Sequence, residues 1–507
     1  MGLSSEPLEA MTEALHRDNY PNVHAVLIAK DGKLVYEEHF EGRAILWEDG
    51  QSKPALARFD RETLYEVRSV TKSVTSAVFG IAVESGAIES VDTSLFDYFP
   101  DYAHLTTPEK REVSLRDVLT MTAGFEWLEG TGGSDDEQVL YADPDPAEVV
   151  LSRPLVTEPG ARYYYSGGLT TLLGLVVGRA TGGSFGAYAR TRLFEPLGIT
   201  HVGWAWPGTE NAPRPAEDGS IYVSSCCQTA WQDVEELHWE GQSPWSSVAV
   251  PSAGLWIRPR DLLKIGSLYL NGGRWNDRQI VSETWVRESL ARHTDQSEGV
   301  QEHGPGVTST SGYGYQWWHT RYLLPYGEIT VHAAVGNGGQ RIWIVPELDL
   351  VAIHITSNYN LWYSSYQADR LLLERIVPWA LGIESGYRHE FARPARALAP
   401  GEWPSVTLPS EESARYVGTY DFADEQLEIY VEDGVLRYEL PGQGSMALFP
   451  AGDHVFVAGL VEDGEPTKLY WPDERVHFVL DESGAAERYE WRSAATGEVA
   501  SVAPRSR

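Results

Sequence analysis

The chain has 507 residues, of which 42% are hydrophobic and 11% aromatic, and its formal net charge is −33 at pH 7. This composition supports a large buried core shared among two or three domains. A strongly acidic surface repels phosphate backbones and anionic bilayers, so we expect neither nucleic acid nor a membrane as a partner.

The N-terminal segment, Met1 to Pro21, mixes charged residues with apolar ones at helical spacing and predicts an amphipathic helix. It lacks the basic start and apolar centre of an export signal. The rest of the sequence contains no run of about eighteen apolar residues, so no membrane span is predicted. We therefore expect a cytoplasmic protein, with a trimmed export signal as the open alternative.

The first strands are expected in the segment from Ala25 to Phe40, where two apolar runs flank Asp31-Gly32, a dipeptide typical of tight hairpins. Helical periodicity then dominates, and strand patterns return later. The predicted helices cover Ser73–Glu84, Leu115–Met121 and Leu172–Ala180, and the later strands cover Ile342–Pro346 and Leu350–Thr356. This order predicts an α+β domain whose antiparallel sheet joins distant parts of the chain.

The composition of the sequence changes near residue 386. The segment from Phe391 to Pro409 is too rich in proline for a helix or a central strand. We predict a first domain over residues 1–385, a linker over 386–411 and a small β domain over 412–507. Alternating runs between turn dipeptides, as in Gln426–Leu440, are typical of a small antiparallel barrel or sandwich.

Ser69 and Lys72 form an S-x-x-K motif at the expected start of an apolar helix. Positions three apart share a helix face, so both side chains would point into the same space. Unsatisfied N–H groups at a helix start favour a developing oxyanion, and a lysine of lowered pKa can take the proton of a serine nucleophile. The alternative is a helix-capping serine followed by an exposed lysine.

The segment from Pro159 to Gly182, PGARYYYSGGLTTLLGLVVGRATG, resembles the second motif of the penicillin-recognising serine hydrolases, the class C β-lactamase-like family. Three further segments agree with this resemblance, which extends from about residue 20 to residue 380: Val113–Trp127, Pro251–Gly266 and Gly312–Trp318. The resemblance implies a β-lactamase/transpeptidase-like fold, with an antiparallel sheet, flanking helices and a helical subdomain. It also implies that Ser69 and Lys72 are catalytic.

The resemblance places the family's tyrosine on Tyr165, with Tyr163 at the preceding aromatic position. A phenol near Lys72 can share its proton and pass it to a leaving group. Tyr164 is the competing candidate, and simple aromatic packing is the alternative for all three.

Two departures from the family pattern concern the substrate pocket. Gly167 stands where the family has an asparagine, so a side-chain amide for a substrate amide oxygen is missing. Ala334 opens the segment that replaces the family's Lys/His-x-Gly motif, so no cation is offered to a substrate carboxylate. Neutral esters or amides are therefore favoured over carboxylate-bearing β-lactams and D-Ala-D-Ala ends.

The resemblance also implies an oxyanion hole formed by the backbone N–H groups of Ser69 and Asn337. Gly336, Gly338 and Gly339 would let the backbone approach the substrate closely, although a plain glycine-rich turn is the alternative. Trp127 could line an acyl pocket, or merely pack.

Other chemistry-bearing residues offer less. Cys226 and Cys227 are adjacent and alone, which fits neither a disulfide framework nor a zinc site. His332 and His354 lie on expected strands, where structural roles are the commoner ones. No metal motif appears, so no cofactor is expected.

The sequence thus predicts a serine hydrolase that cleaves an ester or amide of a small molecule or short peptide through a Ser69 acyl-enzyme. A D-amino-acid peptidase or amidase and a weak β-lactamase are the alternatives within enzymes, and a non-catalytic acyl-ligand-binding or assembly protein is the alternative outside them. The C-terminal part resembles the lipocalin-like β domain that follows this catalytic domain in the family. There it shapes access to the site or assists oligomerisation, so a homo-oligomer is one expected state.

Overall fold

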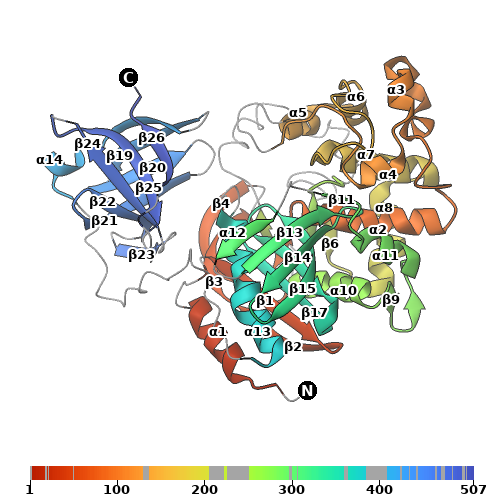
Figure 1. The fold of residues 1–507 in the computed structure, drawn as a ribbon, viewed down its shortest axis with the longest axis horizontal. Helices are drawn as coiled ribbons and strands as arrows, with labels where there is room; N and C mark the ends of the chain where they lie inside the picture. The colour runs from red at the N-terminus through yellow and green to blue at the C-terminus, as the bar shows by residue number, and fades with distance from the viewer. Residues whose placement is uncertain are drawn as a thin grey trace.

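The computed structural model shows an α+β domain followed by an all-β barrel (Figure 1). It describes residues 3–16, 20, 22–48, 51–129, 136–204, 222–224, 250–295, 300–304, 307–358, 363–383, 408–422, 425–432, 434–440, 444–462, 465–469, 474–481, 483–493, 497 and 499–506. Cys226, Cys227 and most of the predicted linker lie outside these ranges.

The main sheet has the strand order β11-β13-β14-β15-β16-β17-β1-β2, with β12 paired to β13. Its strands are β1 Val23–Lys30, β2 Lys33–His39, β11 Thr294–Asp295, β12 Gln301–Gly304, β13 Val307–Tyr313, β14 Trp318–Leu324, β15 Gly327–Gly336, β16 Gln340–Val345 and β17 Leu350–Thr356. The pairing of β1 with β17 is antiparallel and joins the two ends of the domain, which confirms the predicted sheet. The predicted hairpin is present as well, and Asp31 and Gly32 both have positive φ, as its tight turn requires.

The central strands are buried on both faces because alternate side chains enter two different cores. In β1, Ala25, Leu27 and Ala29 belong to one core. Val26 and Ile28 belong to the other. The first core lies beneath α2 and α10, and the second lies beneath α1 and α13. This two-sided burial explains why these strands are almost wholly apolar.

The helices confirm the periodic segments of the sequence. They are α1 Glu6–His16, α2 Val70–Glu84, α3 Pro108–Arg111, α4 Leu115–Leu119, α5 Asp136–Ala142, α6 Pro146–Leu151, α7 Gly167–Thr181, α8 Phe185–Ala189, α10 Pro259–Leu270, α11 Glu283–Leu290, α12 Tyr363–Leu371, α13 Val377–Leu381 and α14 Ser410–Ser413. Helices α3 to α8 gather at one end of the domain as a helical subdomain (Figure 1).

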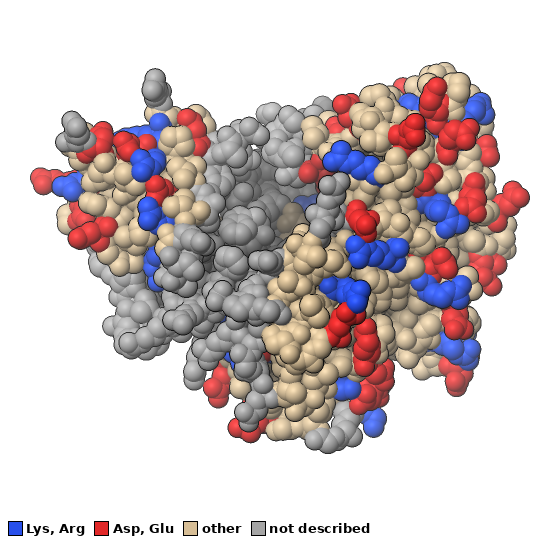
Figure 2. All heavy atoms as spheres, viewed as in Figure 1, with Lys and Arg blue, Asp and Glu red and all other residues tan. Residues whose placement is uncertain are grey.

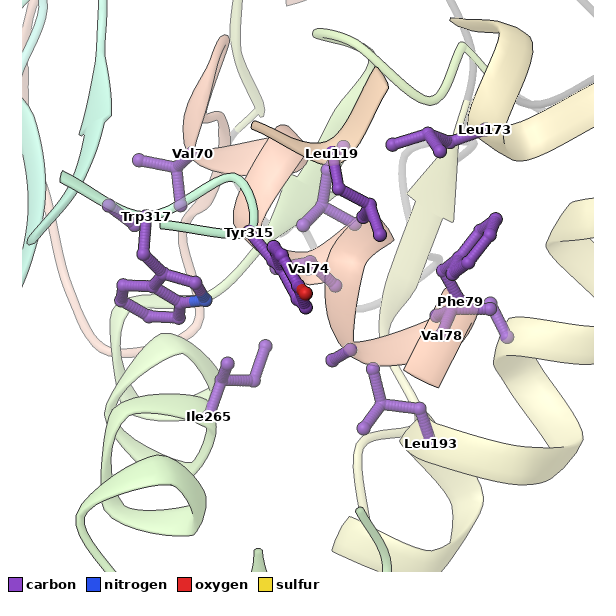
Figure 3. Close-up of a cluster of buried hydrophobic side chains, with 14 of the residues drawn as sticks. Val70, Val74, Val78, Phe79, Leu119, Leu173, Leu193, Ile265, Tyr315 and Trp317 are labelled. Carbon is purple, nitrogen blue, oxygen red and sulfur yellow. The ribbon is translucent and has the colours of Figure 1, made fainter. Parts of the chain in front are cut away.

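Helix α2 runs through the first core and is buried along most of its length. Figure 3 shows Val70, Val74 and Val78 of this helix among side chains from several other elements. The labelled neighbours include Leu119 of α4, Leu173 of α7, Ile265 of α10, and Tyr315 and Trp317 from the segment before β14. This packing fixes the position of the residue that precedes α2, which is Ser69.

A second, smaller sheet has the order β4-β3-β7-β5-β8-β6. Its strands are β3 Glu41–Glu48, β4 Gln51–Arg58, β5 Leu64–Glu66, β6 Val202–Trp204, β7 Tyr222–Ser224 and β8 Leu255–Ile257. A short ribbon joins β9 Arg274–Trp275 to β10 Arg278–Gln279. Strand β5 ends three residues before Ser69, and Val67 donates its N–H to Leu255 of β8 at 2.9 Å, so this sheet anchors the turn into α2.

The C-terminal part is a nearly closed antiparallel barrel with the order β18-β19-β20-β21-β22-β24-β25-β26, and β23 pairs with β22. Its strands are β18 Gly418–Phe422, β19 Glu425–Glu432, β20 Val435–Leu440, β21 Gly444–Gly452, β22 Val455–Glu462, β23 Glu465–Leu469, β24 Glu474–Leu480, β25 Ala486–Ser493 and β26 Val499–Pro504. A bridge between Tyr420 and Arg505 joins the two ends. The predicted all-β domain is therefore a barrel with its own core.

On the face visible in Figure 2, acidic and basic side chains are interspersed over both the α+β domain and the barrel. Among the described helices, none is both long and apolar enough to cross a bilayer.

Candidate active site

Ser69 occupies the position directly before the first residue of α2. Its side chain makes no capping hydrogen bond with the helix, and Lys72 in the next turn is only 1% exposed. These two observations contradict the alternative of a capping serine followed by an exposed lysine. The preceding residue, Arg68, has a φ of 47°, a conformation that side chains other than glycine rarely adopt.

The Lys72 ammonium donates to the Ser69 hydroxyl at 3.0 Å and to the backbone carbonyl of Ser252 at 3.1 Å. The predicted sharing of a helix face is thereby confirmed, and the amine lies within proton-transfer distance of the serine. Ser252 comes from the turn before β8, a contribution that the sequence pattern did not single out.

Tyr165 lies next to this pair. Lys72 Nζ is 4.8 Å from the centre of the Tyr165 ring, and the Tyr165 hydroxyl lies close enough to Ser69 for that side chain to act on its pKa. Burial, together with the charge of Glu129, raises the pKa of Tyr165 well above its ordinary value, so the phenol is protonated at neutral pH. Tyr164, the competing candidate, is 41% exposed, and no contact described here connects it to Lys72.

Aromatic rings fix the position of Tyr165. Its ring stacks on Trp318 at a centroid distance of 5.7 Å and meets Tyr313 edge-on at 6.3 Å. Tyr163 packs against the same two rings. Burial also raises the pKa of Tyr313 well above the ordinary value, while the Lys72 charge acts in the opposite direction. Tyr313 and Trp318 both lie in the segment Gly312–Trp318. Their packing against Tyr165 gives this aromatic segment a structural role at the site.

Two carboxylates complete the cluster, and the sequence analysis missed both. Glu129 Oε1 lies 3.8 Å from Lys72 Nζ, and Glu137 Oε1 lies 4.0 Å from the same atom. Glu129 also accepts hydrogen bonds from the Trp127 indole N–H, at 3.0 Å, and from the backbone N–H of Gly167. Burial, with the nearby charge of Glu137, raises the pKa of Glu129 to about 7.

Gly167 is the point where α7 begins, and its lack of a side chain has a structural reason. A Cβ built on Gly167 would lie 2.3 Å from Glu137 Oε1 and 3.2 Å from Glu129 Oε2. The space that an asparagine would fill in the family pattern is therefore occupied by carboxylate oxygens. The absence of a side chain at Gly167 leaves room for the carboxylates of Glu129 and Glu137.

Trp127 is a buried residue beside this cluster. It is 2% exposed, and a Cβ on Gly168 would lie 2.8 Å from its ring. Its visible connection to the site is the hydrogen bond that holds Glu129.

Hydrogen bonds between the helices stabilise this arrangement. The Gln316 side chain accepts from Thr170 of α7 at 2.7 Å and donates to the Leu119 carbonyl of α4 at 2.9 Å. The backbone carbonyl of Gln316 accepts from Ser73 of α2 at 2.6 Å. Tyr141 of α5 connects Glu137, at 2.8 Å, to the Ser252 hydroxyl, at 3.0 Å. Nothing in the spacing of these residues along the chain could have predicted their meeting.

The glycine segment after β15 lies beside the turn that precedes Ser69. A Cβ on Gly336 would lie 2.4 Å from the Val67 carbonyl oxygen. His354 hydrogen-bonds to the Gly339 carbonyl at 2.7 Å, and Thr356 donates to the Gly338 carbonyl. The backbone of the predicted oxyanion segment is thus held close to α2, and Asn337 is the exposed residue within it.

The two strand histidines have structural surroundings. Burial lowers the pKa of His332 to about 3 and that of His354 to about 4, so both are neutral at pH 7. Among the described residues, no group of three or more histidine, cysteine or acidic side chains lies together in a way that could hold a metal ion.

Comparisons with known proteins agree with this geometry. Residues 12–375 match the family model described as Beta-lactamase. A protein of Salmonella agona with the name "Putative D-alanyl-D-alanine carboxypeptidase" is 23% identical over 334 residues, which cover 59% of this chain and 74% of that protein. A protein of Escherichia coli K12 with the same name is 24% identical over 288 residues, covering 53% of this chain and 64% of that protein.

Solved structures show the same fold at lower identity. An octameric penicillin-binding protein homologue from Pyrococcus abyssi superimposes with a TM-score of 0.52 and 16% identity, covering 98% of this chain and 99% of the other. A penicillin-binding protein homologue from Caulobacter crescentus gives a TM-score of 0.50 and 16% identity, covering 73% of this chain and 97% of the other. Because the family model matches well over half of its length, the chain belongs to the beta-lactamase family.

Proposed function

We propose that the chain is a serine hydrolase in which Ser69 attacks an ester or amide carbonyl, with Lys72 as the base and Tyr165 as a proton relay. The observation that carries the proposal is the 3.0 Å hydrogen bond between the buried Lys72 amine and the Ser69 hydroxyl at the start of α2. A serine hydroxyl is a weak nucleophile unless a nearby base accepts its proton. Lys72 is in place to do so.

In the acylation step, Ser69 Oγ bonds to the carbonyl carbon while its proton passes to Lys72, which takes part in this step as the unprotonated amine. The tetrahedral oxyanion would be held by the backbone N–H groups of Ser69 and Asn337. Collapse expels the leaving alkoxide or amine, which takes a proton from the Tyr165 hydroxyl, and Tyr165 is reprotonated by Lys72. Water then attacks the acyl-enzyme, and the same groups return the proton to Ser69.

Two features favour substrates without a carboxylate next to the scissile bond. Ala334 is buried and brings no cation, and the two carboxylates near Lys72 would repel an anionic substrate. This is why esters or amides of neutral or cationic small molecules and short peptides are preferred here to carboxylate-bearing β-lactams.

The test is hydrolysis of p-nitrophenyl esters by the native chain and by Ser69→Ala. We expect turnover by the native chain and loss of at least about a thousandfold in the variant, because the nucleophile is removed. Retention of turnover by a folded Ser69→Ala protein would exclude Ser69 as the nucleophile. In that case the remaining interpretation is a binding or assembly role for this fold.

A further inference from the structure

We propose that Glu129, supported by Glu137, makes the acyl pocket select substrates with a protonated amine one or two carbons from the scissile carbonyl. The substrate class would be aminoacyl esters or amides with a free amine. This inference rests on the proposed serine hydrolase function and adds the chemical class of the acyl group.

The position of Glu129 relative to Ser69 suits a short aminoacyl group. Ser69 marks where the carbonyl carbon must sit, independently of any acidic residue. Ser69 Oγ lies 3.0 Å from Lys72 Nζ, and Lys72 Nζ lies 3.8 Å from Glu129 Oε1. The carboxylate oxygen is therefore no more than about 7 Å from the attacking oxygen. An α- or β-ammonium that makes a charge-assisted hydrogen bond of about 2.8 Å spans this distance.

The cluster holds more acidic than basic groups. Lys72 faces two carboxyl groups, Glu129 and Glu137, and Glu129 ionises with a pKa of about 7. Their influence extends beyond the ion pairs, because both carboxylates raise the pKa of Tyr165 and Glu129 raises that of Tyr313. A cationic substrate would balance this excess of acid, and an anionic one would add to it.

Hydrogen bonds hold the Glu129 carboxylate in place from one side. The Trp127 indole and the Gly167 backbone both donate to Glu129 Oε2, whereas Oε1 faces Lys72. The oxygen that faces Lys72 is therefore not the one that the Gly167 backbone and the Trp127 indole occupy. Such preorganisation is what a recognition carboxylate needs.

A separate observation also indicates a polar ligand here. The hydroxyl oxygen of Tyr163 is buried and has no hydrogen-bond partner among the described residues. Its phenol lies close enough to Glu129, Tyr165 and Tyr313 for all three to raise its pKa. A buried hydroxyl without a hydrogen-bond partner costs free energy. A substrate that places a polar group or a bridging water beside the Tyr163 hydroxyl would recover that cost and bind more tightly.

The experiment compares two nearly isosteric esters, p-nitrophenyl β-alaninate and p-nitrophenyl butyrate, in which an ammonium replaces a methyl group. Each rate is corrected for spontaneous hydrolysis. We expect kcat/KM of the native chain to favour the β-alaninate by roughly 10- to 100-fold, as for hydrogen bonds to charged groups. In Glu129→Gln this ratio should fall to within about threefold of unity. The ratio is the readout because any effect of Glu129 on Lys72 alters both esters alike.

Glu126→Gln is the matched control, since Glu126 is an exposed carboxylate three residues earlier in the same segment. It should keep the native ratio. Equal kcat/KM for the two esters in the native chain, with turnover still dependent on Ser69, would overturn the amine preference and leave the hydrolase intact. If neither ester is cleaved and Ser69 takes no fluorophosphonate, the proposed function fails and the amine preference fails with it.

A measurement on the native chain covers the case in which Glu129→Gln does not fold. The rate of Ser69 labelling by a fluorophosphonate is followed in the presence of β-alaninamide or of butyramide. We expect β-alaninamide to protect at concentrations at least about tenfold lower. Equal protection by the two amides would contradict the inference.

Discussion

The backbone N–H of Gly167 donates to the Glu129 carboxylate, so a glycine at the start of α7 and an acid 38 residues earlier share one hydrogen bond in the candidate active site. Glu129 in turn lies 3.8 Å from Lys72, the group that contacts Ser69. The residue that departs from the family pattern is thus linked through Glu129 to the proposed catalytic base.

Gly167→Ala tests this coupling by adding a single Cβ. The new atom would lie 2.3 Å from Glu137 Oε1, so one of the carboxylates must move away from Lys72. We expect destabilisation by about 1–3 kcal/mol and loss of esterase activity of tenfold or more. Thermal unfolding and kcat/KM measure the two effects.

Gly183→Ala is the control for that substitution, because nothing lies within 4 Å of a Cβ built there. It should change the free energy of unfolding by no more than about 0.5 kcal/mol. Similar effects of the two substitutions would mean that the carboxylates do not restrict position 167.

Tyr165→Phe removes the hydroxyl that contacts Ser69 while the ring remains stacked on Trp318. We expect kcat to fall by about 100-fold or more, because proton transfer to the leaving group is lost, with little change in stability. Tyr164→Phe, at an exposed ring, should stay within about twofold of native kcat. If the Tyr164 substitution were the damaging one, the assignment of the relay would be reversed.

Lys72→Arg keeps a positive charge opposite Glu129 and Glu137 but cannot release a proton at neutral pH. We expect ester turnover to fall by about 100-fold or more, and Ser69 labelling by a fluorophosphonate to slow similarly. Circular dichroism checks that the variant is folded. Activity within a few-fold of native would show that the role of Lys72 is only to balance charge.

The raised pKa of Glu129 predicts how stability depends on pH. Because burial raises this pKa from 4.5 to about 7, the folded chain binds this proton more tightly than the unfolded chain does. This contribution to stability is therefore greatest below about pH 4.5 and is lost as the pH rises through about 7. Glu129→Gln removes the charged form, so we expect it to unfold at higher denaturant concentration than the native chain at pH 8.

At pH 5 the difference between Glu129→Gln and the native chain should be much smaller, since Glu129 is then protonated in the folded state. Urea unfolding at the two pH values gives the comparison. An equal difference at both values would contradict a raised pKa at Glu129.

The sequence predicted the parts of the fold that depend on local pattern. Asp31-Gly32 marked the hairpin, and the apolar periodicity after Ser69 marked α2, although the helix begins at Val70 rather than Ser73. The S-x-x-K motif also indicated the pairing of Ser69 with Lys72, since positions three apart on a helix meet regardless of the rest of the fold.

The carboxylates could not be predicted in this way. Glu129 and Glu137 lie in a segment without a clear pattern and reach Lys72 only because α7 packs against α2 and α5 packs against α7. In a chain with 73 acidic residues, two more glutamates carry no signal. Gly167 was the available clue, because a missing side chain implies that other atoms fill its place.

The most direct test of the account is intact-protein mass spectrometry after incubation with a fluorophosphonate, followed by peptide mapping, with Ser69→Ala as the control. We predict a single adduct on Ser69 that is absent from the control, because only a serine with an adjacent base reacts readily. A folded native chain that takes no adduct, or takes it at another residue, would contradict the proposal that Ser69 is the activated nucleophile.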